Sequence, residues 1–149
     1  LDHFYLIDTG RPKENTGTMV AKVQLTMNND QLRMKKVFDR NEKQVERVVQ
    51  ALKTGDEKTL IDAIQKGEQT LEDMGVVSEK VKPLIREIEK AGGAAKILGG
   101  GGVTDGVGFL LCYHTDKKKI EEIISNYYYS NTKIILGEAG AKIDLAEYK

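Results

Sequence analysis

Short apolar runs along the chain predict four β-strands. They lie at residues 4–7, 94–98, 109–113 and 133–136, and the first and last of them end at turn signals. Because both faces of the first run are apolar, we expect that strand to lie in the interior of its sheet. Residues 141–145 alternate apolar and polar side chains and could add an edge strand.

The segments between these runs carry apolar residues at three- and four-residue spacing, which predicts amphipathic helices. Several of the expected helix starts lie at residues whose side-chain oxygens can cap a helix. In chain order, the predicted helices begin at Asn15 or Thr16, include residues 45–52, run from Asp56 to Gly75, begin at Ser78, and begin at Thr115 or Asp116. Residues 28–30 either interrupt the first helix or continue it.

The resulting order is one strand, several helices, two strands, one helix and one strand. This is the split β-α-β, or ferredoxin-like, arrangement with extra helices in its first crossover. We therefore predict an α+β fold with an antiparallel sheet and helices on one face. At 149 residues the chain is long enough to bury a core, and we expect one domain over residues 1–149.

The composition limits the classes of partner. The 23 basic residues balance 23 acidic ones, so the formal net charge is zero and we expect no nucleic-acid binding. No apolar run reaches the length of a membrane span and no secretory signal is visible, so we expect a cytoplasmic protein that does not bind membranes. The single cysteine, Cys112, excludes an internal disulfide, and its apolar neighbours predict a small buried side chain.

The most unusual stretch is residues 92–108, which hold eight of the fifteen glycines, four of them consecutive. We refer to residues 99–108 as the glycine loop. Ordering several glycines is costly, so such a loop is retained where positive φ angles or close approach of a ligand requires it. Successive unobstructed amides form a concave anion site that suits phosphate. A flexible hairpin connection without any ligand is equally compatible with this spacing.

Other reactive side chains have simpler structural explanations. His3 and His114 lack partners at the spacing of a metal site or catalytic triad, so we predict structural roles for both. Asp8, at the end of a strand, is expected to order a turn rather than to bind magnesium. Lys96 can point to either face of its strand. The tyrosines at 127–129 end a helix and are expected to belong to the core and its rim.

Three motifs in order resemble the C-terminal domain of the GHMP kinase superfamily. Residues 6–10 (LIDTG) followed by 15–20 (NTGTMV) are similar to the first strand and helix start of that domain. Residues 91–97 (AGGAAKI), leading into the glycine loop, resemble the third conserved motif of the superfamily. The loop itself departs from the commoner pattern, because Leu98 replaces a threonine and residues 103–105 interrupt the glycines. Within the superfamily, the motifs are most similar to those of mevalonate kinases.

The resemblance implies ATP-dependent phosphorylation of a small-molecule hydroxyl, with mevalonate as the expected substrate in isoprenoid biosynthesis. It implies that four glycines face the nucleotide phosphates: Gly99, Gly100, Gly101 and Gly102. It also implies that four residues face the substrate: Thr16, Thr104, Asp105 and Gly106. From the residues alone, Thr16 is a plain helix cap, and Asp105 could orient a metal or a substrate hydroxyl or close a turn.

The same resemblance assigns the catalytic groups, and most of the binding of ATP and Mg²⁺, to an N-terminal domain. The Pro-x-x-x-Gly-x-Gly-Ser-Ser-Ala loop of that domain does not occur in this chain, which begins at Leu1. We therefore expect the C-terminal part of a kinase, inactive alone, with no catalytic or metal-binding residue of its own. The expected partners are the substrate, its own N-terminal domain and a second copy of the chain.

Three alternatives stay open at this point. Another GHMP kinase, acting on phosphomevalonate, homoserine or a sugar, would share the motifs. A non-catalytic ferredoxin-like module would use the glycine loop to hold a small anionic metabolite. A structural oligomerisation domain would need no ligand. The fold alone does not separate these functions.

Overall fold

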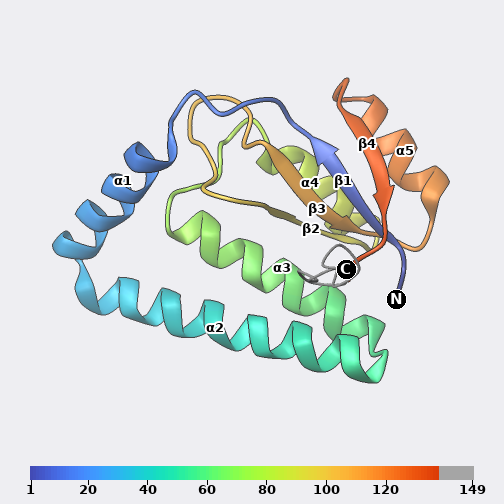
Figure 1. Cartoon of the computed structure of the whole chain (residues 1–149), viewed down its shortest axis with the longest axis horizontal. Helices are drawn as coiled ribbons and strands as arrows, with labels where there is room; N and C mark the ends of the chain where they lie inside the picture. Colours follow the sequence, from blue (N-terminus) through green and yellow to red (C-terminus); the bar gives the residue numbers. More distant parts are fainter. Residues whose placement is uncertain (138–149) are drawn as a thin grey trace, which may run out of the picture.

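The computed structural model describes residues 1–137, so the possible edge strand at 141–145 lies outside the described residues. The elements are β1 (Phe4–Asp8), α1 (Thr16–Asn29), α2 (Gln31–Thr54), α3 (Glu57–Asp73), α4 (Lys82–Lys90), β2 (Ala94–Ile97), β3 (Phe109–Tyr113), α5 (Lys117–Ser125) and β4 (Ser130–Ile134) (Figure 1). The strands form one antiparallel sheet in the order β2-β3-β1-β4. The predicted ferredoxin-like α+β fold, with extra helices in the first crossover, is confirmed.

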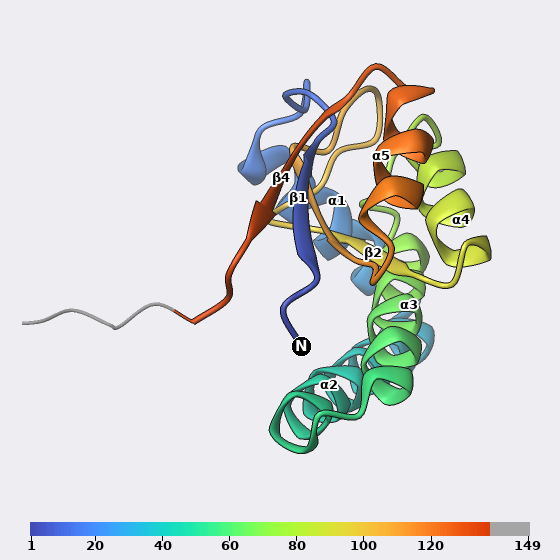
Figure 2. The ribbon, with the colours of Figure 1, turned by 90° about the vertical axis from the view of Figure 1, so that its right-hand side faces the viewer.

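One face of the sheet carries the main core. β1 lies between β3 and β4, which confirms the expected interior position of the first strand. Tyr5 pairs with Cys112 and Ile7 with Leu110, and all four side chains are buried. They share a face because side chains two positions apart point the same way along a strand. α4 and α5 cover this face, and their buried isoleucines complete the core (Figure 2).

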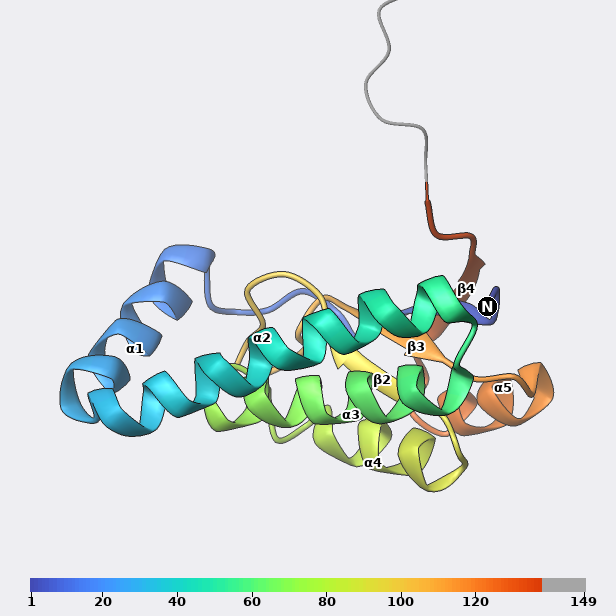
Figure 3. The ribbon, with the colours of Figure 1, turned by 90° about the horizontal axis from the view of Figure 1, so that it is seen from below.

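The extra helices complete one edge of the sheet. α3 runs beside β2, and α2 packs along α3 (Figure 3). Alternate backbone groups of an edge strand point outward without a partner strand. Here the carboxylate of Glu68 accepts a hydrogen bond from the Ile97 amide at 2.9 Å, and Gln65 Nε2 donates to the Gly93 carbonyl at 2.7 Å. Side chains of α3 therefore satisfy backbone groups at the outer edge of β2.

The start of α4 differs from the prediction. The helix begins at Lys82 rather than at Ser78, and its N-cap residue makes no side-chain hydrogen bond. The Ser78 hydroxyl instead accepts from the Lys80 amide at 3.2 Å in a local turn. Pro83 lies in the first turn of the helix, where a missing N–H costs little.

The limits of the last strand differ from the prediction, and the open question of whether residues 28–30 interrupt the first helix is answered. β4 spans Ser130–Ile134 rather than 133–136, because its pairing with β1 sets its extent. Residues 28–30 do interrupt the first helical region. The Asp30 amide donates to the Thr26 carbonyl at 3.0 Å, and the Asp30 carboxylate accepts from the Arg33 amide at 3.1 Å. Asp30 thus ends α1 and begins α2.

The helix expected around residues 45–52 is confirmed as part of α2, but much of its apolar face is not buried. Val45, Val49 and Leu52 are exposed, whereas Met34 and Val37 are buried.

None of the helices within residues 1–137 combines the length and the apolar character needed to cross a bilayer.

Candidate functional site

Two loops meet at one end of the sheet and form the candidate site. The first is the β1–α1 loop, residues 9–15, and the second is the glycine loop. They meet because β1 and β3 are antiparallel neighbours, so Asp8 at the end of β1 pairs with Phe109 at the start of β3. Asp8 also accepts a hydrogen bond from the Gly10 amide at 2.9 Å. This contact confirms the predicted role of Asp8 in ordering the turn.

Thr9 joins the two loops directly. Its amide and its hydroxyl both donate to the Gly108 carbonyl, at 2.9 and 2.7 Å, and the hydroxyl accepts from the Val107 amide at 3.0 Å. The Gly108 amide in turn donates to the Gly10 carbonyl at 2.9 Å. The C-terminal end of the glycine loop is therefore fixed to the end of β1.

Two glycines of the loop are required by close packing. Gly101 has a φ of +71°, and a Cβ there would lie 2.0 Å from the carbonyl oxygen of Val76. The next amide, that of Gly102, donates to this same carbonyl at 3.0 Å. A Cβ on Gly106 would lie 2.3 Å from the carbonyl oxygen of Thr9. The loop thus packs between two backbone segments, and side chains at these positions would separate them.

The start of the glycine loop keeps free hydrogen-bond donors. Among residues 1–137, no protein acceptor pairs with the amides of Gly99, Gly100 and Gly101. The Gly102 amide, in contrast, is occupied by Val76. Within residues 1–137, three of the four glycines expected to face phosphate therefore have amides without an acceptor.

The N-terminus of α1 lies against these amides. Asn15 caps the helix by accepting from the Thr18 amide at 2.9 Å. In the described part of the chain, the amides of Thr16 and Gly17 have no acceptor. A Cβ on Gly100 would lie 3.8 Å from Cγ2 of Thr16, so the two residues are in contact range. The partial positive charge of a helix N-terminus adds to the attraction of this region for anions.

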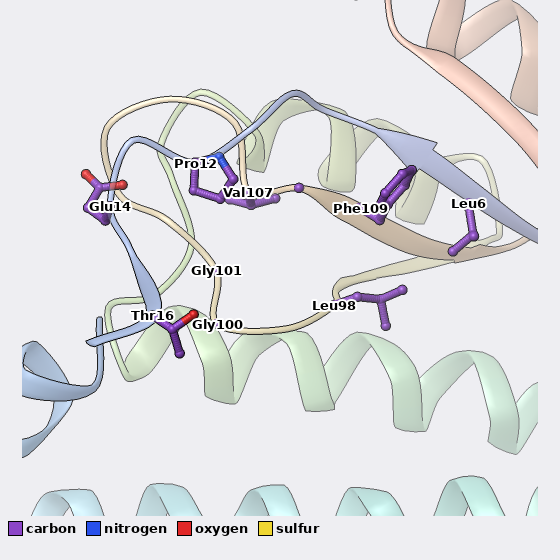
Figure 4. Close-up of a pocket in the computed structure, with 10 residues that line it drawn as sticks. Leu6, Pro12, Glu14, Thr16, Leu98, Gly100, Gly101, Val107 and Phe109 are labelled. Carbon is purple, nitrogen blue, oxygen red and sulfur yellow. The ribbon is translucent and has the colours of Figure 1, made fainter. Parts of the chain in front are cut away.

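A cavity of about 310 Å³ lies between the two loops (Figure 4). It is lined by Leu6, Pro12, Glu14, Thr16, Leu98, Gly100, Gly101, Val107, Gly108 and Phe109. Glu14 and Thr16 lie toward one end of the cavity, whereas Leu6, Leu98 and Phe109 lie toward the other. A second hollow of about 320 Å³ shares Thr16 and Gly100 and extends along α1. One end of the site is therefore polar and the other apolar.

The cavity gathers only part of the residues expected from the sequence. Thr16, Gly100 and Gly101 line it, and Gly99 lines the adjoining hollow. Thr104 and Asp105 line neither space. The outer part of the glycine loop, where these two residues lie, is instead attached to neighbouring loops.

Asp105 connects three loops through two lysines. Lys80 Nζ lies 2.5 Å from Oδ1 of Asp105, and Lys13 Nζ lies 3.6 Å from Oδ2. The hydrogen bond from Lys80 lowers the pKa of Asp105, and the same contact raises the pKa of Lys80. Asp105 is therefore ionised, and its ion pairs with Lys13 and Lys80 join the glycine loop to the two neighbouring loops.

Glu14 is a site residue that the sequence patterns did not single out. Its carboxylate accepts from the Val103 amide at 3.2 Å and from the Thr104 hydroxyl. The hydrogen bond from Thr104 lowers the pKa of Glu14. Its partners lie about ninety residues further along the chain, so no local pattern could identify them.

The remaining candidates lie outside the cavity. His114 is held by the Ala91 carbonyl, 3.2 Å from Nε2, and accepts from the Asp116 amide at Nδ1, 3.0 Å away. Cys112 is fully buried, and burial raises its pKa to about 12. Lys96 is half-buried and donates to the Ile97 carbonyl at 2.8 Å. No group of His, Cys, Asp and Glu side chains within residues 1–137 has an arrangement that could hold a metal.

Comparison with known proteins finds similarity in structure but not in sequence families. No family model and no curated protein matches the chain. The Lin0012 protein from Listeria innocua superposes with a TM-score of 0.77 at 22% identity, covering 89% of this chain and 38% of that chain. L. major mevalonate kinase in complex with R-mevalonate gives a TM-score of 0.70 at 17% identity, covering 83% and 36%. Streptococcus pneumoniae phosphomevalonate kinase in complex with phosphomevalonate and AMPPNP gives 0.71 at 16% identity, covering 88% and 39%.

The chain spans less than two fifths of the length of each of these proteins. At identities of 16–22% the likeness establishes the fold alone. The strand order and the helices of this chain match those expected from the sequence motifs. The described residues therefore have the fold of the C-terminal domain of GHMP kinases, as found in these mevalonate and phosphomevalonate kinases.

Proposed function

We propose that the chain is the C-terminal domain of an ATP-dependent small-molecule kinase of the GHMP type. The observation that carries this proposal is the convergence of unpaired amides at 99–101 with the N-terminus of α1 around one cavity. Phosphoryl transfer requires positioning and charge stabilisation more than covalent help. Fixed amides directed at the transferring group can supply such stabilisation without reorganising during the reaction.

The unpaired amides form two sets, those of Gly99–Gly101 and those at the start of α1, and each set has its own role. The amides of Gly99, Gly100 and Gly101 face the oxygens of the transferring phosphoryl group. The Gly102 amide belongs to neither set, because its hydrogen bond to Val76 holds the loop in place. The start of α1, at Thr16, receives an anionic group of the substrate such as a carboxylate. Residues 104–106 keep the substrate side of the loop in shape.

The apolar end of the cavity limits the class of substrate. Leu6, Leu98 and Phe109 suit a short aliphatic portion, and the polar end suits an anion. Two proteins with this fold are in complex with R-mevalonate and phosphomevalonate, respectively. We therefore favour mevalonate or a close relative, in isoprenoid biosynthesis in the cytoplasm. Homoserine and sugar kinases of the same type are the nearest alternatives.

ATP and Mg²⁺ require groups beyond the described residues. The amides at 99–101 suit phosphate, but Mg²⁺ prefers carboxylate oxygens, and Glu14 and Asp105 are already paired. We propose that an N-terminal domain supplies most of the nucleotide and metal contacts, together with the catalytic groups. This chain then contributes one wall of the site and has no activity alone.

The variant Gly100→Ala tests this proposal. Gly100 does not have a positive φ and a Cβ there meets only Thr16, so the fold should tolerate a methyl group that intrudes between the two donor sets. With the ATP-binding domain in place, we expect kcat/KM for mevalonate to fall by about tenfold or more. Gly67→Ala, in α3 and away from the site, is the matched control because its Cβ also meets only an ordinary contact, at 3.7 Å.

Two results would contradict the proposal. Full activity in Gly100→Ala would reduce the glycine loop to a connection between β2 and β3. Binding of small anions without phosphoryl transfer to any hydroxyl substrate would favour the non-catalytic metabolite-binding module instead. Circular dichroism and the thermal midpoint of each variant establish that the fold is retained.

A further inference from the structure

We infer that Glu14 is a positioning residue, whose carboxylate holds the glycine loop in register with the start of α1. Its role is to keep the amides at 99–101 and the N-terminus of α1 directed at the same ligand. This inference rests on the proposed function only in taking that ligand to be a phosphate group. The sequence motifs do not include Glu14, and the pairing of β1 with β3 does not explain why a carboxylate stands at this position.

The contacts of Glu14 span the two loops. One carboxylate oxygen accepts from the Val103 amide at 3.2 Å, and the other accepts from the Thr104 hydroxyl. Hydrogen bonds to a charged acceptor are the stronger kind, and two on one carboxylate also fix its direction. Val103 and Thr104 directly follow the run of four glycines, which has little stiffness of its own. Glu14 therefore holds the loop at the point where its flexible part ends.

The packing around Gly102 supports the same role. A Cβ on Gly102 would lie 2.8 Å from the carbonyl oxygen of Gly106, 3.1 Å from Cβ of Pro12 and 3.3 Å from a carboxylate oxygen of Glu14. The absence of a side chain at Gly102 lets the β1–α1 loop lie directly over the glycine loop. The amide of Gly102 meanwhile bonds to Val76 from the other side. The loop is thus held on both sides immediately after its unpaired amides.

Glu14 is also adjacent in sequence to the residues that begin α1. Asn15 caps the helix and Thr16 lines the cavity beside Gly100. One tripeptide, residues 14–16, therefore fixes the glycine loop through its first residue and presents the helix N-terminus through its last. The distance between the two donor sets is set by this short segment and by the carboxylate that anchors it.

Glu14 brings a negative charge to the lining of the proposed anion site. Its two neutral donors, the Val103 amide and the Thr104 hydroxyl, keep Glu14 charged and fix the direction of its carboxylate, so the repulsion has to be offset by nearby positive charge. On the outer side of the loop, Lys13 and Lys80 pair with Asp105 and add positive charge. A carboxylate at position 14 is therefore compatible with phosphate binding, and its hydrogen bonds explain why one is present.

Pyrophosphate binding to the 149-residue chain tests the inference. We would follow the amide signals of Gly99, Gly100 and Gly101 in ¹⁵N-labelled protein during titration with pyrophosphate. Glu14→Ala removes both hydrogen bonds and should weaken binding by roughly tenfold or more, since the loss of even one hydrogen bond to a charged group costs about tenfold. Glu14→Gln keeps one acceptor oxygen and should recover part of the affinity. The exposed Glu46→Gln on α2 is the control and should bind as the unaltered chain does.

A double variant tests the path of the effect. Thr104→Val removes the hydroxyl at nearly constant volume and should weaken binding. Adding it to Glu14→Ala should weaken binding no further, because Glu14→Ala has already removed the contact that Thr104 makes. The thermal midpoints of the variants separate positioning from stability. A positioning role predicts that the variants change the pyrophosphate affinity and the glycine amide signals while the thermal midpoint stays nearly unchanged. If Glu14→Ala does not fold, the same measurements on Glu14→Gln and Thr104→Val test the role.

The outcomes distinguish this inference from the proposed function. Equal pyrophosphate affinity in the unaltered chain, Glu14→Ala and Thr104→Val overturns the role of Glu14 and leaves the proposed function intact. No pyrophosphate binding by the unaltered chain overturns the phosphate-facing role of the loop. Hydrogen exchange of the bonded Gly102 and Val103 amides, measured without ligand, then decides the role of Glu14. Unchanged exchange of both amides in Glu14→Ala overturns that role as well.

Discussion

Glu68 is a fully buried carboxylate at the edge of the sheet. One oxygen accepts from the Ile97 amide, and the other has no hydrogen-bond partner in the described part of the chain. Burial raises the pKa of Glu68 to about 7, even though the hydrogen bond from Ile97 opposes the shift. The folded protein therefore holds a proton that the unfolded chain releases near pH 4.5.

The variant Glu68→Gln should remove a pH dependence of stability. The folded-state pKa is raised, so the contribution of neutral Glu68 is complete below about pH 4.5 and is lost as the pH rises through about 7. On the order of 3 kcal/mol of unfolding free energy is at stake across this window. Urea unfolding at several pH values should show Glu68→Gln gaining on the unaltered chain between pH 5 and 8. The other carboxylates are common to both proteins, so their effects cancel in the difference of unfolding free energy. If that difference does not change with pH, the raised pKa of Glu68 is contradicted.

Residues of the site were predictable only where a motif or a local geometry marks them. The glycine run and the helix start led to Thr16, Gly100 and Gly101, which share one cavity. Glu14 and Thr9 act through partners about ninety or more residues away, so their roles required the fold. A substrate-facing role for Thr104, Asp105 and Gly106 stays a prediction.

At the scale of elements, Asp30 is the joint between α1 and α2. Its amide closes the last turn of α1, and its carboxylate caps α2 through Arg33. α1 packs mainly against α2, so the joint determines where the start of α1 stands relative to the glycine loop. A change at Asp30 should therefore affect both the stability of α2 and the site at the other end of α1.

We expect Asp30→Ala to cost about 1 kcal/mol of unfolding free energy, the usual loss for a helix N-cap. Asp39→Ala, an exposed change inside α2, is the matched control and should stay within about 0.5 kcal/mol. Thermal unfolding followed by circular dichroism makes the comparison. A similar loss in both variants would show that charge, rather than capping, is responsible.

Elements were predictable where their own residues set their limits. The span of α3, its N-cap Asp56 and the N-cap Asp116 of α5 follow from local spacing and capping. The limits of β4 depend on pairing with β1, and the start of α4 depends on a turn at Ser78. Neither of these is encoded within the element itself. The role of α3 at the edge of β2 could not be inferred from periodicity, because it uses polar side chains.

At the scale of the whole molecule, apolar side chains remain exposed near the candidate site. Leu98 and Phe109, which line the apolar end of the cavity, are 36% and 48% exposed. Under the proposed function this surface receives the N-terminal domain. In the chain alone it is open to a second copy, since exposed apolar patches favour association.

We expect the isolated chain to associate with itself through this surface. Light scattering over a concentration series should give an average mass above the 16.6 kDa of the chain. The double variant Leu98→Ser with Phe109→Ser should lower that mass, whereas Leu25→Ser on α1, 61% exposed, should not. A strict monomer at the highest concentration would contradict the expectation.

The interior position of β1 also determines the order in which the sheet can assemble. β1 is near the beginning of the chain, yet both of its partner strands lie about a hundred or more residues later. α2 and α3 are consecutive, so their contacts form between chain neighbours and close early. Joining β1 to β3 closes a far longer loop, with a larger entropic cost. During synthesis, the strand at the centre of the sheet is made first, and its pairing is complete only once β4 has been made.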